Sequence, residues 1–153
     1  MAQSSSGFDM SKMSMGSKTL LGSGVLLIIF SFFAWQKECP ADDLCRSWNM
    51  WGGSGSAFGF LGGLVLIALV VWEVLQAAGT NLSVGQPVSK ISAYLGFATA
   101  GLVLIKFLFA LTESPAFGAF IGLILALGVA YGAWMRLQEP AAMPVAPTNE
   151  GLA

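Results

Sequence analysis

Four apolar segments of roughly 20 residues each restrict the fold of this 153-residue chain more than any other feature. They cover residues 19–36, 57–78, 91–112 and 116–137. The hydrocarbon core of a bilayer is about 30 Å thick, and a helix of about 20 residues crosses it. The chain is 56% hydrophobic and 10% charged, whereas roughly a quarter of the residues in soluble domains are charged. We therefore predict an all-α membrane protein, a bundle of four transmembrane helices in contact with the lipid bilayer.

Two polar stretches flank the predicted membrane domain, which covers residues 18–138. Residues 1–17 are rich in Ser, Met and Gly, and residues 139–153 contain three prolines. Neither stretch can bury enough apolar surface to offset the entropy of ordering, so we expect two flexible cytoplasmic tails. The first apolar segment is followed by AWQKECP rather than by a small-residue cleavage site, so we expect it to be retained as a span.

The distribution of Lys and Arg predicts the orientation, because cytoplasmic loops carry an excess of these residues. With the N-terminus inside, the cytoplasmic side holds Lys12, Lys18, Lys90 and Arg136. The outer side then holds Lys37 and Arg46. We therefore predict that both termini lie in the cytoplasm.

Composition also excludes several kinds of site. The chain has no histidine, which removes bis-histidine haem, histidine-ligated zinc or copper, and Ser-His-Asp or Cys-His catalysis. Its net charge of −1 and lack of a basic tract give no reason to expect nucleic acid as a partner. The Gly-rich run at 52–63 lacks the Gly-Lys-Ser of a phosphate loop. We expect no cofactor and no metal.

A single lysine, Lys106, lies within the apolar run LVLIKFLFAL of the third segment. An uncompensated charge there costs about 2.5–3.5 kcal/mol on insertion scales. Helical spacing places Lys106 on one face with small or polar residues, namely Ser92, Gly96, Thr99, Val103, Ala110 and Glu113. Small and polar side chains face neighbouring helices in membranes, so we expect Lys106 to point into the bundle. It is either a transport residue or, as we favour, a packing residue neutralised by an outer-loop carboxylate.

The acidic residues differ in how well they suit Lys106. Asp42 and Asp43, at the tip of the first outer loop, are the favoured partners. Glu113 shares the face of Lys106 but lies two turns away, beyond the spacing of a helical ion pair. Glu73 falls near the opposite end of its span, so we expect no pair with Lys106 and predict an acid reaching the inner interface.

The two cysteines, Cys39 and Cys45, lie close together in the first outer loop. An even count, short spacing and an oxidising compartment together predict a structural disulfide. The spacing is not the C-x-x-C of disulfide oxidoreductases, and two thiols with neighbouring carboxylates are a poor metal site. Tryptophans should form belts at the interfaces: Trp35, Trp48 and Trp51 outside, and Trp72 with Tyr131 and Trp134 inside.

Helix boundaries and contacts also have sequence signals. Ser114 with Pro115 predicts the N-cap and first-turn proline of the fourth span, and Ser89 can cap the third. Three small-xxx-small pairs are present: Gly59 and Gly63, Gly118 and Gly122, and Gly128 and Gly132. They either pack the helices of one chain or leave a face for another subunit, and their number mildly favours assembly with a partner or a second copy.

The phrases LLGSGVLLIIFSFFAW and KFLFALTESPAFGAFIGLILALGVAYGAWMRL, with a tryptophan-bearing outer loop between them, resemble small uncharacterised four-span membrane proteins of actinobacteria. The resemblance covers most of residues 18–138. It implies the inner membrane of a bacterium, and it implies no activity, since such families have none assigned.

These observations lead to two functional expectations. The favoured one is a non-enzymatic membrane subunit or scaffold, associated with a larger envelope or energy-converting complex. The alternative is a small oligomeric transporter or channel in which Lys106 lines a path for anions or polar solutes. An enzyme is the weakest class, because the sequence shows no nucleophile with a matching base.

Overall fold

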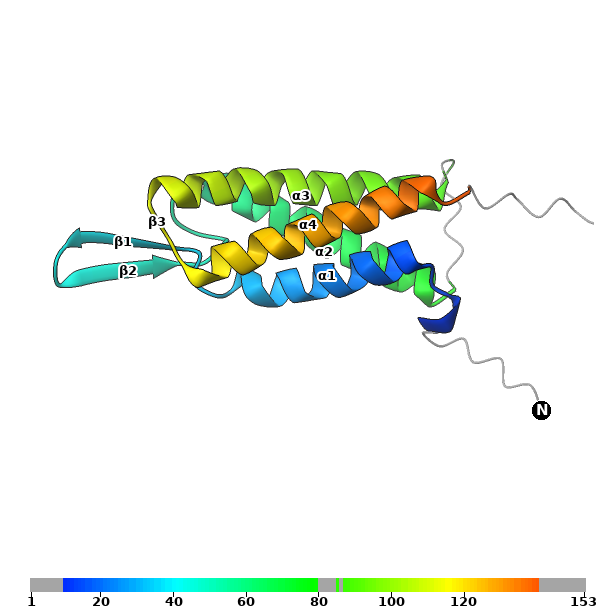
Figure 1. Ribbon diagram of the computed structural model, residues 1–153, viewed down its shortest axis with the longest axis horizontal. Helices are drawn as coiled ribbons and strands as arrows, with labels where there is room; N and C mark the ends of the chain where they lie inside the picture. The colour runs from blue at the N-terminus through cyan, green and yellow to red at the C-terminus, as the bar shows by residue number, and fades with distance from the viewer. Residues whose placement is uncertain (1–9, 80–84, 86, 141–153) are drawn as a thin grey trace, which may run out of the picture.

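The computed structural model describes residues 10–79, 85 and 87–140, and within them four helices form an up-and-down bundle (Figure 1). The helices are α1 (Met15–Ser31), α2 (Ser56–Ala77), α3 (Val88–Thr112) and α4 (Phe117–Gln138). A short 3₁₀ helix, η1 (Met10–Lys12), precedes them. Helix α4 packs along both α1 and α3, α2 packs on α3, and the contact between α1 and α2 is the smallest of the four. The predicted four-helix arrangement is confirmed.

Helices α2, α3 and α4 begin and end within three residues of the predicted bounds, and each is long and apolar enough to cross a membrane. Helix α1 is different: it has 17 residues and lies nearer the N-terminus than the predicted 19–36. Ser14 caps it, so the last residues of the predicted N-terminal tail are helical. The predicted cap of α3 is wrong, because Pro87 is the N-cap and Ser89 lies inside the helix.

The first outer loop contains strands that the sequence analysis did not predict. Strands β1 (Gln36–Ala41) and β2 (Leu44–Trp48) form an antiparallel hairpin that projects beyond the helices (Figure 1). Strand β3 (Ser114–Pro115) pairs with β1 on its other side, giving the order β2-β1-β3. The predicted disulfide between Cys39 and Cys45 is confirmed and closes the hairpin. The all-α prediction therefore holds for the bundle but not for this loop.

Strand β3 also explains why the predicted cap of α4 is wrong. Helix α4 begins at Phe117, and its N-cap, Ala116, makes no side-chain cap hydrogen bond. Instead, the Ala116 N–H donates to the Trp35 carbonyl at 2.8 Å. The Gly118 N–H donates to the Ala34 carbonyl at 2.9 Å. Backbone oxygens of the linker between α1 and β1 thus satisfy the first amides of α4, which a serine was expected to do.

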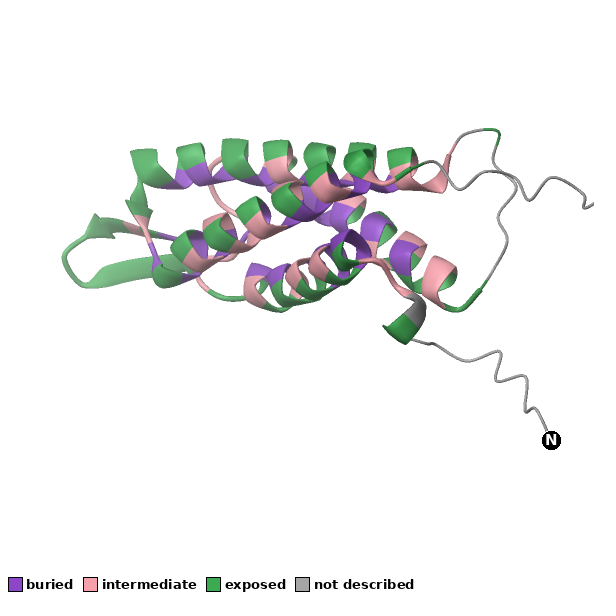
Figure 2. Cartoon of the chain, turned by 45° about the vertical axis from the view of Figure 1, so that its right-hand side comes forward, coloured by how far each residue is buried: buried purple, intermediate pink, exposed green. Residues whose placement is uncertain are grey.

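Burial follows one stripe on each helix, and the opposite faces are exposed and largely apolar (Figure 2). On α3 the buried residues are Ser92, Ala93, Gly96, Thr99, Val103, Lys106, Phe107 and Ala110. The small and polar face predicted from spacing is therefore the face that packs, except that Glu113 is exposed beyond the helix end. The outward apolar side chains are what contact with a lipid bilayer requires.

The six glycines predicted at helix contacts all lie in tight places within the chain. A Cβ on Gly59 would lie 1.9 Å from the Met50 carbonyl oxygen, and one on Gly63 would lie 2.3 Å from the Trp51 ring. Gly118 and Gly122 approach residues 34–35 in the same way, while Gly128 and Gly132 face α1. Internal packing accounts for the whole pattern, so it no longer favours a second subunit.

Two tryptophans of the predicted outer belt, Trp35 and Trp51, take part in this packing. Trp35 is fully buried against Gly122, and its Nε1–H donates to the Phe30 carbonyl at 3.0 Å. The belt prediction is therefore wrong for Trp35. At the other end of the bundle, Tyr131 and Trp134 are exposed and adjacent, as expected at an interface.

Candidate functional site: two buried polar clusters

Two clusters of buried polar side chains lie at opposite ends of the bundle. We call the end that carries β1, β2 and β3 the hairpin end, and the end where α1 begins and α4 finishes the tail end (Figure 1). Lys106 of α3 is the centre of the cluster at the hairpin end. Arg136 of α4 and Glu73 of α2 are the centre of the other. All three side chains are buried.

Lys106 is surrounded by neutral oxygen atoms. Its Nζ donates to the Gly52 carbonyl at 2.7 Å, the Ser54 carbonyl at 2.5 Å and Gln36 Oε1 at 3.2 Å. An ammonium has three N–H donors, so every donor of Lys106 has a partner. The cost of burying the charge is offset by hydrogen bonds to backbone and amide oxygens rather than by a salt bridge.

The favoured acidic partners of Lys106 do not reach it. Asp42 and Asp43 are exposed at the tip of the hairpin, which carries them away from the bundle. Glu113 is exposed as well, and within the described residues no carboxylate lies within 4.0 Å of the Lys106 ammonium. The prediction of a direct carboxylate partner is therefore wrong, because the hairpin projects outward instead of folding over the helices.

An outer-loop acid is nevertheless connected to Lys106 through one intermediate. Gln36, which accepts from Lys106, donates from Nε2 to Glu38 Oε1 at 3.4 Å. The other carboxylate oxygen of Glu38 accepts from Trp48 Nε1 at 3.1 Å. Strands β1 and β2 thus hold a short polar chain that ends on the buried lysine. Sequence reasoning missed Gln36, because a glutamine at a span boundary is an unremarkable residue.

The carbonyl groups that bind Lys106 belong to the loop between β2 and α2. Gly53 and Gly55 have φ angles of 71° and 72°, a region that residues with a Cβ rarely adopt. Gly53 directly follows Gly52 and Gly55 directly follows Ser54, the two residues whose carbonyls accept from Lys106. The loop is also tied to α1: the Met50 N–H donates to the Ser31 carbonyl at 3.0 Å. The first four residues of the Gly-rich run, 52–55, therefore form a binding loop for the Lys106 ammonium, which we call the cradle.

Glu73 is not the interfacial acid that the sequence predicted. It is fully buried on α2, where its Oε2 accepts a hydrogen bond from the Ser17 hydroxyl of α1. Its Oε1 lies 3.8 Å from Arg136 Nε on α4. Three helices meet around this carboxylate, so it is enclosed by protein instead of reaching the lipid headgroups. The prediction that Glu73 does not pair with Lys106 is consistent with these contacts.

Arg136 joins the remaining helix to this cluster. Its Nη2 donates to Gln76 Oε1 of α2 at 2.7 Å and to Ser92 Oγ of α3 at 3.2 Å. Its Nη1 donates to Glu139 Oε2, just beyond the end of α4, at 2.6 Å. The sequence analysis used Arg136 only as a cytoplasmic charge. The signal it missed is spacing, because Arg136 continues the four-residue repeat of Gly128 and Gly132 on the packed face.

Not every polar atom of the tail-end cluster is satisfied. Glu73 Oε1 and Arg136 Nε have no hydrogen-bond partner among the described residues, although they face each other as opposite charges. Thr99 Oγ1, midway along α3, is also without a partner there. Removing one partner of such a buried pair leaves the other charge uncompensated, which is strongly destabilising.

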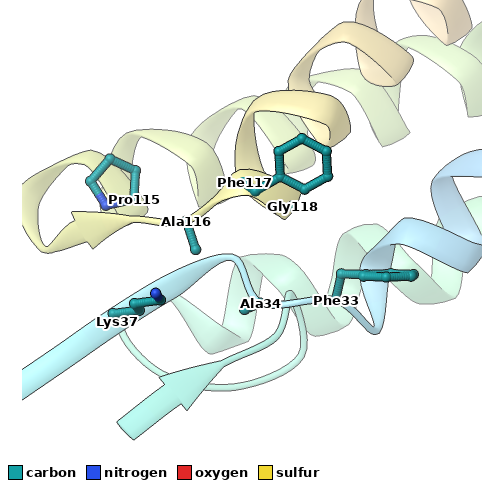
Figure 3. A pocket seen from close by; sticks show the side chains of 7 residues that line it. All are labelled: Phe33, Ala34, Lys37, Pro115, Ala116, Phe117 and Gly118. Atoms are coloured by element: carbon teal, nitrogen blue, oxygen red, sulfur yellow. The ribbon is translucent and has the colours of Figure 1, made fainter. Parts of the chain in front are cut away.

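Surface grooves lie at both ends. At the tail end, two grooves of about 340 and 350 Å³ lie on either side of Glu139. At the hairpin end, a groove of about 630 Å³ lies between β1 and the end of α3. A second one, of about 380 Å³, lies between the α1–β1 linker and the start of α4 (Figure 3).

The described residues contain no group of three or more His, Cys, Asp or Glu side chains placed to hold a metal ion. The chain matches no protein family, no curated protein and no solved structure.

Proposed function

We propose that this chain is a non-enzymatic integral membrane subunit or scaffold that associates with a larger membrane complex. In this proposal the hairpin lies on the outer side of a bacterial plasma membrane and both termini are cytoplasmic, as the Lys and Arg distribution predicts. The proposal rests on the contacts that the three buried charged side chains make. Lys106, Glu73 and Arg136 all contact other parts of the same chain.

The hydrogen bonds that Lys106 makes within the chain favour a structural role over the transport alternative. A residue that lines a path for anions must present its charge to water or to the solute. The Lys106 side chain is fully buried, and each of its N–H donors already has an acceptor. For Lys106 to meet a solute, the loop that carries Gly52 and Ser54 would first have to move away.

The hairpin is the part of the chain best suited to contact a partner protein. It projects beyond the helices, and its residues from Cys39 to Ser47 are exposed (Figure 2). Its disulfide restricts its conformations, which lowers the entropy lost when a partner binds. Its tip carries two adjacent carboxylates, Asp42 and Asp43, so a partner with a basic surface would suit it.

The test is purification of the tagged protein from its native membrane in a mild detergent, followed by mass spectrometry of the proteins that elute with it. We expect a partner in stoichiometric amount. Asp42→Lys should lower its recovery at least severalfold, because the reversed charge would face a basic surface. Lys90→Glu is the matched control, since it reverses one exposed charge at the other end of the bundle.

If the protein elutes alone or as a self-oligomer, the subunit proposal fails. Reconstitution in liposomes then tests the alternative: solute flux by the wild-type protein that is lost in Lys106→Met would make it a transporter or channel.

A further inference from the structure

The groove of about 380 Å³ at the hairpin end combines apolar walls with a single charge. Its walls come from the α1–β1 linker, through Phe33 and Ala34, and from residues 115–118 at the start of α4. Lys37 of β1 is the one charged residue among those that line it. Figure 3 shows the rings of Phe33 and Phe117 toward one end of the groove and Lys37 toward the other.

The height of this groove along the bundle matches the edge of a bilayer. Helix α4 has 22 residues, and at a rise of about 1.5 Å per residue it is about 33 Å long. This length is close to the hydrocarbon thickness of about 30 Å. The first turn of α4, which forms one wall of the groove, therefore lies where acyl chains meet headgroups.

The aromatic side chains at the groove are poorly covered by protein. Phe117 is 68% exposed and Phe33 is 51% exposed, and the neighbouring Phe32 is 64% exposed. Rings at this depth contact the upper part of an acyl chain rather than water. A lipid tail lying against Phe33 and Phe117 would cover apolar surface that the chain itself leaves open.

Lys37 remains available to a ligand. Within the described residues it makes no salt bridge, and its neighbour Glu38 is engaged by Gln36 and Trp48. The N–H groups of Ala116 and Gly118 already donate to the linker. The ammonium of Lys37 is therefore the donor that a phosphate group entering this groove would meet.

We propose that this groove binds one anionic phospholipid of the leaflet on the hairpin side. The phosphate contacts the Lys37 ammonium, and the first part of an acyl chain lies against Phe33 and Phe117. The negatively charged headgroup complements the single positive charge of the groove. The site does not depend on the proposed subunit function, because it involves only this chain and the membrane.

Native mass spectrometry of the purified protein, titrated with phosphatidylglycerol or phosphatidylcholine, tests the site. We expect the wild-type protein to bind phosphatidylglycerol preferentially, and Lys37→Gln to lower that preference by about fivefold, the effect of one lysine at an anionic surface. Lys37→Arg should keep the preference. Lys90→Gln, at the other end of the bundle, is the matched control and should leave it unchanged.

A second variant tests the apolar part of the site. Phe117→Ala removes an exposed ring and should weaken the binding of both lipids while leaving the preference between them intact. The proposal is overturned if Lys37→Gln keeps the wild-type preference, or if Lys90→Gln lowers it as much as Lys37→Gln does. It is also overturned if Phe117→Ala binds both lipids as the wild-type protein does.

Discussion

The two ends of the bundle bury a cation in different ways. At the hairpin end, Lys106 is bound by two backbone carbonyls and one amide oxygen, all of them neutral. At the tail end, Arg136 lies between two carboxylates, those of Glu73 and Glu139. The lysine has all its hydrogen bonds, whereas the pair formed by Arg136 Nε and Glu73 Oε1 has none. Lys106 is therefore held by hydrogen bonds to neutral oxygens alone, whereas Arg136 combines hydrogen bonds from Nη1 and Nη2 with a charge contact between Nε and Glu73.

Because their partners differ, the two cations fix the positions of different parts of the molecule. The carbonyl partners of Lys106 belong to one loop, so Lys106 orders the segment that leads from the hairpin into α2. The contacts of Arg136 and Glu73 draw on all four helices, through Ser17, Glu73, Ser92 and Arg136. We infer that Lys106 positions the hairpin relative to the bundle and that the Arg136 cluster sets how the helices align.

The largest expected effect comes from removing the Lys106 ammonium from the oxygens that accept its hydrogen bonds. Lys106→Met keeps a side chain of similar length but leaves three oxygens without this donor: the buried Gln36 Oε1 and the half-buried carbonyls of Gly52 and Ser54. A fully buried oxygen without a donor costs about 1–3 kcal/mol, and each half-buried carbonyl costs about 1 kcal/mol, at the lower end of that range. We therefore expect the free energy of unfolding to fall by about 3–5 kcal/mol in total. Denaturant titration in mixed micelles measures it, with the exposed Lys90→Met as control. Equal stability of Lys106→Met and the wild-type protein would contradict the cradle.

A somewhat smaller loss is expected at the tail end. Arg136→Met leaves the Glu73 carboxylate buried without its counter-charge and should lower the free energy of unfolding by about 3 kcal/mol. Adding Glu73→Gln removes the stranded charge, so the double variant should be more stable than Arg136→Met alone. The same denaturant titration compares the two. A double variant less stable than Arg136→Met would show that the charge contact is not what holds this cluster.

The smallest effect is expected at the tip of the hairpin. Asp42→Asn with Asp43→Asn removes the two carboxylates that the sequence favoured as partners of Lys106. Both are exposed and remote from the cradle, so the melting temperature should change by no more than about 1 °C. Thermal unfolding followed by circular dichroism measures it. A large drop would mean that the tip does fold back onto the lysine.

The sequence was sufficient to predict the features that depend on local pattern. The lengths of the apolar segments predicted the positions of α2, α3 and α4, and the spacing of Cys39 and Cys45 predicted the disulfide. The small-residue face of α3 predicted that Lys106 points inward. Each of these signals lies within one segment of chain, where residue type and period are informative.

The features that were missed depend on contacts between distant segments. Strand β3 has two residues, and its pairing with β1 exists because the helices bring residues 36 and 115 together. Two of the three acceptors of Lys106 are backbone carbonyls, which have no side-chain signature. The glycines at 53 and 55 were the one sequence signal for these carbonyls. The packing of Trp35 on Gly122 likewise depends on the α1–β1 linker meeting α4.

The most direct test of the structural role of Lys106 is its chemical accessibility in the folded protein. A small amine-acylating reagent, applied to the protein in mild detergent and followed by peptide mass spectrometry, reports the labelling rate of each lysine. We predict that the exposed Lys37 and Lys90 label readily, that Lys106 labels at least tenfold more slowly, and that the difference disappears on unfolding. Labelling of Lys106 at the rate of Lys37 would show an open path to its ammonium and would contradict a structural role for Lys106.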